Sequence, residues 1–259
     1  MDEPADRQAR HKTKAAQHAY NAARHRGTPQ APPSFMLELG IKFVLSYFAG
    51  SLMGSLIVGK LRGGVDIRNM GSGNAGGSNA LRTQGWKFAL GVLAIDIGKG
   101  AFAAGVIPTL NLPPIGADAS ISRVWLTLSC AAGAVVGHVW PIWFNFRGGK
   151  GAATMLGTLA VLAPGLILPV LLVFAWVLTL FGYAGLASMS AGLFAPLYVA
   201  LTRLPEEQPL FIYCILMALY LIFCHRSNIR RMLAGTESRN THLMLFHRKR
   251  DGVKADADD

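Results

Sequence analysis

Long apolar stretches recur along this chain and constrain its fold more than any other feature. A bilayer core requires roughly 20 mostly apolar residues for each helical span. Apolar side chains make up 52% of the chain and charged ones only 15%, which is too apolar for an ordinary soluble domain. The sequence therefore predicts an all-α membrane domain that crosses the bilayer several times. The candidate spans are 35–61, 86–110, 121–144, 152–181, 183–201 and 210–224.

The stretch 152–181 is long for one span and contains Pro164-Gly165. Because proline breaks a helix, we expect a short helix there that turns back into a full one. The chain then has six or seven membrane segments, and the expected fold class is an all-α polytopic membrane protein with about seven transmembrane helices. The membrane domain covers 35–240. The polar residues 1–34 form a basic tail that is predicted to be disordered, and 241–259 form a charged tail.

Basic residues are distributed unevenly along the chain, and this predicts its orientation. The segments 60–87, 147–150 and 225 onward carry Lys and Arg, whereas 111–120 carries none. By the positive-inside rule the three basic segments face the cytoplasm, so the first span starts outside. The basic tail at 1–34 then lies on the side that its charge disfavours. In a membrane protein with a net charge of +11, this excess favours anionic lipid or an anionic substrate over nucleic acid.

The sequence does not indicate a disulfide framework or a metal site. Cys130, Cys214 and Cys224 lie in apolar stretches without C-x-x-C spacing, so neither disulfides nor a zinc site are expected. No cluster of Asp and Glu offers a cage for a hard cation. We therefore expect no metal and no cofactor. The G-x-S-x-G elbow of serine hydrolases is absent as well.

The first basic segment contains a glycine-rich loop. Gly71, Gly73 and Gly76 match G-x-G-x-x-G, but a dinucleotide fingerprint needs a preceding strand, and here an apolar span precedes the loop. The loop is then either a flexible connection or an anion site in which backbone N–H groups converge on a phosphate. The polar side chains available to such a site are Ser72, Asn74, Asn79 and Arg82.

The second basic segment runs from Gly-His-Val-Trp-Pro at 137–141 to Arg-Gly-Gly-Lys-Gly at 147–151. It is not a Walker A loop, because the glycine that opens that motif is missing and Lys150 is followed by glycine. Gly148, Gly149 and Lys150 before a new apolar helix suit a phosphate bound at the helix N-terminus. A lysine at a membrane boundary also often extends to the lipid headgroups, so both interpretations stay open.

Ionisable residues also occur inside and beside the spans. Asp96 and Lys99 share a helix face, and they either pair to lock helix packing or point together into a polar cavity. His225 and Asn228, after the last span, also share a face if that segment is helical. His225 is either a headgroup contact or a base.

Together these motifs resemble the bacterial acyl-phosphate:glycerol-3-phosphate acyltransferase family (PlsY type). Each motif alone is modest, but four of them in this order between these spans are specific. The resemblance implies a seven-helix enzyme of the bacterial cytoplasmic (inner) membrane, with its N-terminus outside and glycine-rich active-site loops on the cytoplasmic side. The resemblance extends over 36–239 and is carried by 71–82, by Asp96 with Lys99-Gly100, by 137–141 with 146–154, and by 225–237.

The activity implied by the resemblance is transfer of a fatty acyl group from acyl-phosphate to the 1-hydroxyl of sn-glycerol 3-phosphate, giving lysophosphatidic acid and phosphate. The implied partners are these substrates and membrane lipid, with no nucleic acid and no cofactor, and the chain is expected to be a monomer. The implied catalytic residues are Ser72, Lys150 and His225. The implied substrate-binding residues are Gly73, Asn74, Asn79, Arg82, Lys99, Gly148, Gly149, Ser188 and Asn228.

Three features depart from the family pattern. Ser78 replaces a threonine and keeps the hydroxyl, and the basic tail at 1–34 is additional. Gly185 replaces a serine near a Gly-Tyr turn, which leaves Ser188 as its stand-in.

Acyl-phosphate is already activated, so the enzyme mainly positions two anions and neutralises their charge. The departing phosphate can then take the proton of the attacking hydroxyl, with His225 as the rival base. The alternative function is a membrane transporter of a phosphorylated small metabolite, because glycine loops and broken helices also occur in anion carriers. A weaker alternative is a lipid-binding scaffold without catalytic activity.

Overall fold

The computed structural model describes residues 34–113 and 121–245. Within these ranges the chain is helical and contains no strand. Of the tail predicted to be disordered at 1–34, all but Ser34, which begins α2, lies outside the described ranges, as does most of the tail predicted at 241–259. The boundaries of the 35–240 domain stay predictions. The helices are α2 (Ser34–Gly50), α3 (Gly54–Leu61), α4 (Gly77–Gln84), α5 (Trp86–Gly105), α6 (Arg123–Val139), α7 (Ala152–Leu162), α8 (Ile167–Phe181), α9 (Ala184–Thr202), α10 (Gln208–Cys224) and α11 (Arg226–Leu233).

Several of these helices are long and apolar enough to cross a membrane. The pair α10 and α11, which is bent by 53°, adds a sixth span to the five found in the described ranges. Because three of the eight residues of α11 are arginines, we take Cys224 as the end of that span. The all-helical membrane fold is confirmed, and the count of seven spans stays a prediction. The five spans are Leu37–Leu61, Trp86–Thr109, Arg123–Phe144, Pro164–Phe181 and Ala184–Thr202.

The chain breaks near Pro164, as the sequence predicts. α7 has 11 residues, about 16 Å at 1.5 Å per residue, which is less than a bilayer core of about 30 Å. A 3-10 turn at Pro164–Leu166 separates it from α8. α7 packs mainly on α5, whereas α8 packs mainly on α9, so the two parts of this stretch have different neighbours.

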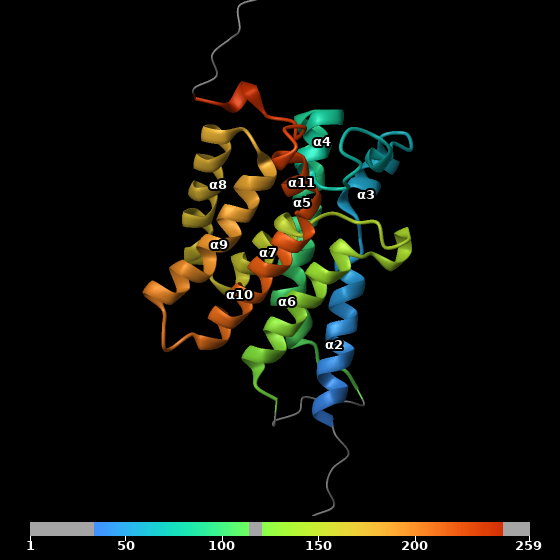
Figure 1. The fold of residues 1–259 in the computed structure, drawn as a ribbon. Helices are drawn as coiled ribbons and strands as arrows, with labels where there is room; N and C mark the ends of the chain where they lie inside the picture. Colours follow the sequence, from blue (N-terminus) through green and yellow to red (C-terminus); the bar gives the residue numbers. More distant parts are fainter. Residues whose placement is uncertain (1–33, 114–120, 246–259) are drawn as a thin grey trace, which may run out of the picture.

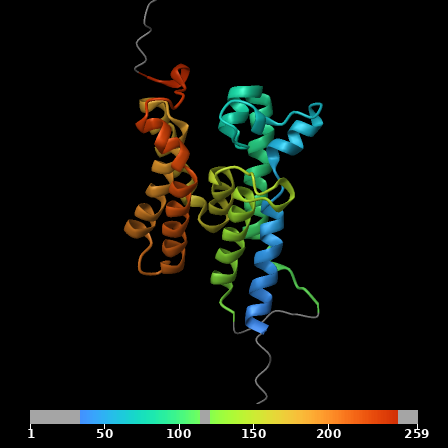
Figure 2. The ribbon, with the colours of Figure 1, turned by 45° about the vertical axis from the view of Figure 1, so that its right-hand side comes forward.

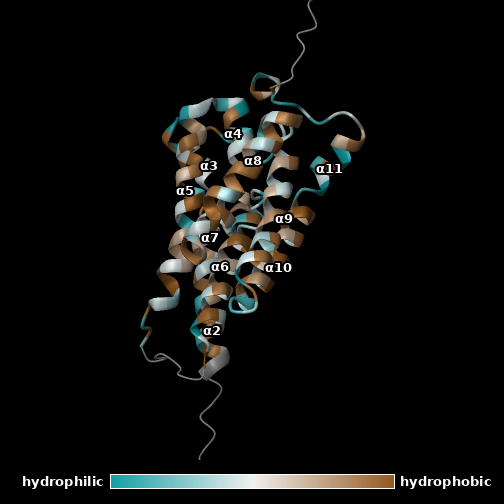
Figure 3. Cartoon of the chain, turned by 90° about the vertical axis from the view of Figure 1, so that its left-hand side faces the viewer, coloured by the Kyte–Doolittle hydropathy of each residue, from teal (hydrophilic) through white to brown (hydrophobic). Residues whose placement is uncertain are grey.

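The polar segments gather toward one end of the bundle. Figure 1 shows α3, α4 and α11 at its upper end, opposite the start of α2 and the connection between α9 and α10. In Figure 3 the hydrophilic colour is prominent on α4 and α11, whereas hydrophobic residues are prominent along the longer helices. This distribution places the polar loops at one end of an apolar bundle.

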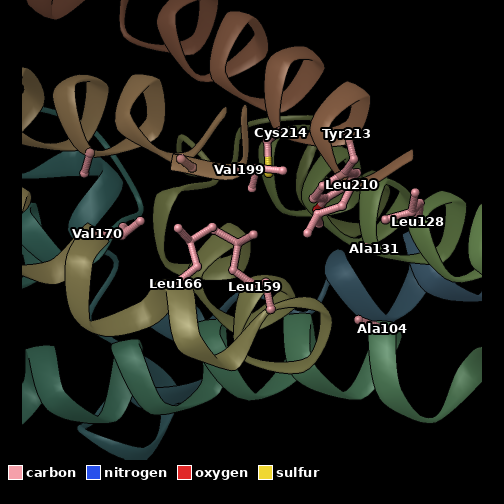
Figure 4. Close-up of a cluster of buried hydrophobic side chains, with 13 residues drawn as sticks. Ala104, Leu128, Ala131, Leu159, Leu166, Val170, Val199, Leu210, Tyr213 and Cys214 are labelled. Atoms are coloured by element: carbon pink, nitrogen blue, oxygen red, sulfur yellow. The ribbon is translucent and has the colours of Figure 1, made fainter. Parts of the chain in front are cut away.

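A shared apolar core joins two groups of helices. Figure 2 shows α8, α9 and α10 grouped apart from α2, α5 and α6. The side chains in Figure 4 come from both groups and form one buried cluster, in which Leu128 of α6 and Leu159 of α7 meet Val199 of α9 and Tyr213 of α10. Since lipid tails are as apolar as leucine, such close packing, and not exclusion from water, holds membrane helices together.

Glycines bring some of these helices into direct backbone contact. A Cβ atom at Gly50 would lie 2.1 Å from the carbonyl oxygen of Ala134, and one at Gly100 would lie 2.2 Å from that of Thr154. Both distances are too short for any larger residue, so α2 packs on α6, and α5 on α7, through glycine.

Buried charges at the lower end of the bundle are paired. The ammonium of Lys42 lies 2.8 Å from Glu38 Oε1 and donates to the carbonyl of Pro108 at 2.8 Å. Arg123, at the start of α6, also pairs with Glu38 at 2.8 Å. This cluster ties α2 to the ends of its neighbours on the side opposite the polar loops.

Candidate active site

The first glycine-rich loop is held from beneath by Asn79. This side chain is 2% exposed. Its Nδ2 donates to the carbonyls of Ile67 at 2.8 Å, Asn74 at 2.9 Å and Met70 at 3.1 Å, and its Oδ1 accepts the N–H of Ser72 at 2.9 Å. These bonds occupy both N–H groups of the amide, one of them shared between two carbonyls, and one of the two lone pairs of its oxygen. The structure therefore places Asn79 as a support of the loop, and its predicted contact with substrate stays a prediction.

The conformation of this loop requires glycine. Gly71 and Gly73 have φ angles of +55° and +70°, in the left-handed region that other residues rarely adopt. A Cβ atom at Gly71 would also lie 2.5 Å from Asn79 Oδ1. Ser72, between the two glycines, is exposed, and Asn74 accepts the N–H of Gly76 at 2.9 Å. The loop thus presents Ser72 on its outer side.

The glycines of the second loop are required by their contact with His138. A Cβ atom at Gly148 would lie 2.0 Å from the carbonyl oxygen of His138, and one at Gly149 would lie 2.1 Å from its Nε2. Their N–H groups donate to the carbonyls of Val139 and His138 at 3.2 Å and 3.1 Å. These two N–H groups are therefore bonded within the protein, and the predicted contact of Gly148 and Gly149 with substrate stays a prediction. The N–H groups of the first turn of α7 have no partner within that helix and remain available.

A chain of charged contacts joins the second and third polar segments. The ammonium of Lys150 donates to Asn228 Oδ1. Asn228 Nδ2 donates to Glu237 Oε1 at 2.6 Å, and Arg231 Nε lies 2.5 Å from Glu237 Oε2. Asn228 is buried and packs against α9, where a Cβ atom at Gly185 would lie 3.0 Å from its Nδ2. The predicted residues Lys150 and Asn228 are thus brought together.

Lys150 and Arg231 border a cavity of about 590 Å³, which Gly148 and Gly149 also line. Asn74 contributes from the first loop, and Val139, Trp140, Phe146 and Cys224 form an apolar part of the wall. No acidic residue lines it within the described part of the chain. The cavity is therefore an anion-attracting space with an apolar side. Its basic side chains are Arg147, Lys150, Arg226, Arg230 and Arg231.

Burial and neighbouring charge change the acid–base properties of two groups here. Burial, together with the positive charge of Arg231, lowers the pKa of Lys150 to about 8. Burial lowers the pKa of His225 to about 4, although its Nδ1 is hydrogen-bonded to the carbonyl of Leu221 at 2.8 Å. At pH 7 Lys150 is therefore mostly charged and His225 is neutral.

Arg68 connects the first loop to the second. The carboxylate of Asp66 accepts hydrogen bonds from the Arg68 guanidinium at 2.7 Å and 3.0 Å, and this contact lowers the pKa of the Asp66 carboxyl. Arg68 Nη1 then donates to the carbonyls of Phe144 at 3.3 Å and Arg147 at 3.4 Å. From the sequence, Arg68 was recognisable only as one of the charges of the segment 60–87, and the Asp-x-Arg spacing was the available signal of this role.

The remaining predicted residues lie outside the cavity wall. Arg82 is exposed on α4, close enough for its charge to lower the pKa of Lys150. Ser188 donates to the carbonyl of Ala184 at 2.9 Å within α9. Lys99 is buried and paired with Asp96 at 2.9 Å. The structure thus favours the pairing interpretation for Lys99 over the cavity interpretation, and its contact with substrate stays a prediction.

Sequence reasoning missed several basic residues at the cavity. Arg147, Arg226, Arg230 and Arg231 line it, and Glu237 fixes both Asn228 and Arg231. In the described ranges no group of three or more His, Cys, Asp and Glu is placed to hold a metal ion. The chemistry available at this site is therefore the binding and charge neutralisation of anions.

Comparisons with known proteins show the family to which this chain belongs. Residues 40–235 match the family described as Glycerol-3-phosphate acyltransferase. A glycerol-3-phosphate acyltransferase of Chlorobium phaeovibrioides is 38% identical over 230 residues, which cover 80% of this chain and 98% of the relative. One from Pelodictyon phaeoclathratiforme is 39% identical over the same shares.

Solved structures of PlsY (YgiH), an integral membrane glycerol 3-phosphate acyltransferase, have the same fold. The glycerol 3-phosphate form matches with a TM-score of 0.66 and 31% identity, and the lysophosphatidic acid form with 0.66 and 29%. Each match covers 78% of this chain and 94% of the solved one. These matches favour an acyltransferase over the transporter that the sequence left as the alternative. This chain therefore belongs to the glycerol-3-phosphate acyltransferase family of the PlsY type and is an integral membrane enzyme.

Proposed function

We propose that the acyl donor of this enzyme is acyl-phosphate and that its products are lysophosphatidic acid and inorganic phosphate. The supporting observation is the cavity beside Lys150 and Asn228, whose wall carries five basic side chains and none that is acidic within the described residues. An acyl-phosphate and glycerol 3-phosphate each bring one phosphate group. Such a cavity can hold both, because each anion finds several cations of its own.

The acyl group needs an apolar surface next to this charge. Trp140, Phe146 and Val139 provide it on one side of the cavity, and Trp140 packs edge-on against Tyr220 of α10 with ring centroids 5.6 Å apart. A donor placed with its phosphate near Lys150 can direct its chain past these rings toward the lipid. This arrangement supports a donor whose long acyl chain is joined through its carbonyl carbon directly to phosphate.

The reaction is a single displacement at the acyl carbon. The 1-hydroxyl oxygen of glycerol 3-phosphate bonds to this carbon, and the bond from the carbon to the phosphate oxygen breaks. The leaving phosphate takes the electron pair, and Lys150 stabilises the negative charge that grows on it. Holding both anions in one cavity supplies much of the acceleration, because it replaces a chance encounter with a fixed geometry.

The departing phosphate is also the better base. Phosphate esters have a second pKa of about 6, whereas the pKa of His225 is lowered to about 4. Base efficiency rises with pKa up to the working pH, so the proton of the hydroxyl goes to the phosphate. His225 then acts as a neutral hydrogen-bonding group beside the substrates.

The location of the reaction follows from the charge of the polar segments. The loops around Arg68, Lys150 and Arg231 are basic, and such segments stay on the cytoplasmic side of a bacterial membrane. We therefore propose that the enzyme works in the cytoplasmic membrane with its cavity facing the cytoplasm. PlsY has been solved in glycerol 3-phosphate and lysophosphatidic acid forms, which supports the same acceptor and product here.

A comparison of donors tests this proposal. The purified protein in detergent micelles is given glycerol 3-phosphate with one of three donors. These are acyl-phosphate, acyl-CoA and acylated acyl carrier protein, each carrying an acyl chain of the same length. The expected result is acylation of glycerol 3-phosphate with acyl-phosphate, at a rate at least about 100-fold above that with either thioester. Equal or faster acylation from a thioester would show that the donor is wrongly assigned.

A further inference from the structure

A second group of ionisable side chains lies beneath the second loop and outside the cavity wall. Asp96 and Lys99 project from α5 and His138 from the last turn of α6, and all three are buried. The Lys99 ammonium lies 2.9 Å from Asp96 Oδ1, and His138 Nδ1 lies 3.5 Å from the same oxygen. Ionisable groups within membrane helices are costly, so a buried cluster of three calls for a functional explanation.

This cluster holds the break between α2 and α3. Lys99 Nζ donates to the carbonyl of Leu52 at 2.7 Å, and the N–H of Gly54 lies 3.3 Å from Asp96 Oδ1. A break leaves backbone groups without helical partners. The side chains of Lys99 and Asp96 serve as those partners here. Because α3 leads into the first glycine-rich loop, the cluster fixes the direction in which that loop leaves the bundle.

The same cluster supports the second loop. The carbonyl of His138 accepts the N–H of Gly149 at 3.1 Å, and a Cβ atom at Gly149 would lie 2.1 Å from His138 Nε2. The backbone of the loop therefore rests directly on the imidazole ring. Lys150 follows Gly149, so the position of this ring determines the backbone position from which the Lys150 side chain extends toward Asn228.

We infer that Asp96, Lys99 and His138 are positioning residues that set the two anion-binding loops relative to each other. On this inference they act from outside the cavity and not through contact with substrate. The negative charge of Asp96 orients the His138 ring, and His138 supports the backbone of the second loop. The ion pair of Asp96 and Lys99 holds the start of α3. The inference rests on the proposed role of Lys150. It gives Lys99 a role in the same reaction from outside the cavity.

The double variant Asp96→Asn/Lys99→Met separates positioning from stability. Each single variant leaves one buried charge without its partner, which destabilises a protein strongly, whereas removal of both charges often restores stability. The double variant should therefore melt at a higher temperature than either single variant. Its kcat should stay at least about tenfold below the parent with a change in KM below about threefold, because a displaced Lys150 weakens stabilisation of the transition state. Restored melting together with parental kcat would overturn the inference.

A matched control uses the buried pair at the other end of the bundle. Glu38→Gln/Lys42→Met removes an ion pair that is equally buried but lies far from both loops, so its kcat should equal that of the parent. Lys150→Ala is measured in the same assay. If Lys150→Ala kept parental kcat, the proposed role of Lys150 would fail. If Lys150→Ala were inactive while the double variant was fully active, only the positioning inference would fail.

A second variant decides the matter if Asp96→Asn/Lys99→Met does not fold. Gly149→Ala places a methyl group against the His138 ring and must push the loop away from it. We expect the turnover rate to fall by at least about tenfold. Gly98→Ala on α5 is its control, because a Cβ atom there meets no atom within 4 Å. Parental kcat in folded Gly149→Ala protein would show that contact with His138 does not position Lys150.

Discussion

The ammonium of Lys150 donates a hydrogen bond to Asn228 Oδ1, although 78 positions separate the two residues in the sequence. Lys150 belongs to the loop before α7 and Asn228 to α11, and Glu237 in turn accepts from Asn228 at 2.6 Å. A phosphate bound as proposed in the adjoining cavity would therefore meet groups from two different polar segments at once. The site depends on packing between the two groups of helices, and no single loop forms it.

Removing the charge of Lys150 should abolish most of the activity. Lys150→Ala takes away the ammonium that faces the departing phosphate, and loss of one such group typically costs 10²- to 10³-fold in rate. We expect kcat/KM, measured by phosphate release, to fall by at least about 100-fold. Lys87→Ala is the matched control, because Lys87 is exposed and its ammonium lies 5.7 Å from the centre of the Trp86 ring. A loss of less than about fivefold in Lys150→Ala would contradict the proposed role.

The pH dependence should report the ionisation of Lys150. Its pKa is lowered to about 8 by burial and by Arg231, so the charged, active form prevails below pH 8 and is lost as the pH rises through this value. The profile of kcat/KM, which reflects the free enzyme, should fall tenfold per pH unit above about 8. In Lys150→Arg this limb should disappear from the accessible range, because guanidinium does not deprotonate there. A limb that persists near pH 8 in Lys150→Arg would assign it to another group.

Replacing His225 should leave catalysis largely intact. With its pKa lowered to about 4 by burial, this residue is a weaker base than the departing phosphate. We expect His225→Gln to retain kcat within about fivefold, measured with acyl-phosphate at saturating glycerol 3-phosphate. If turnover instead fell by about 100-fold or more while KM stayed unchanged, His225 would be identified as the general base.

Loss of Asn79 should loosen the first loop. Asn79→Ala removes the amide that bonds to the N–H of Ser72 and to three carbonyls, two of which keep a backbone N–H partner. Buried groups left unsatisfied typically cost about 1–3 kcal/mol each. We expect a lower melting temperature in micelles and faster proteolysis between Met70 and Gly76. Ser78→Ala is the control, since Ser78 is exposed on the same helix. Unchanged proteolysis in Asn79→Ala would mean that the loop is held by other contacts.

Composition and the length of the apolar stretches sufficed to predict the helical membrane fold. The span predicted at 86–110 is found at Trp86–Thr109, and the break predicted at Pro164 is present. These features depend on local properties, apolar content and the chemistry of proline, which are visible in a single sequence. The charge of the loops likewise marked the segments that gather at one end.

The contacts that build the site could not be predicted in the same way. Gly148 and Gly149 were interpreted as donors to an anion, but their N–H groups bond to Val139 and His138, and their small size matters more. Asn79 supports the first loop through carbonyls of residues 67–74, and it meets them only once this segment has folded around its side chain. Such roles arise from tertiary packing between distant segments, which spacing along one chain does not reveal.

The most direct test of the account asks whether the three polar segments share one face and one cavity. Single substitutions Ser72→Cys, Arg147→Cys and Arg226→Cys are made in a chain whose natural cysteines are replaced by alanine, and each is treated with a membrane-impermeant maleimide from either side of sealed vesicles. The account predicts labelling of all three from the same side, the cytoplasmic one, and slower labelling at 147 and 226 when glycerol 3-phosphate and a non-reactive acyl-phosphate analogue are both present. Labelling from opposite sides, or no protection by the two ligands, would contradict it.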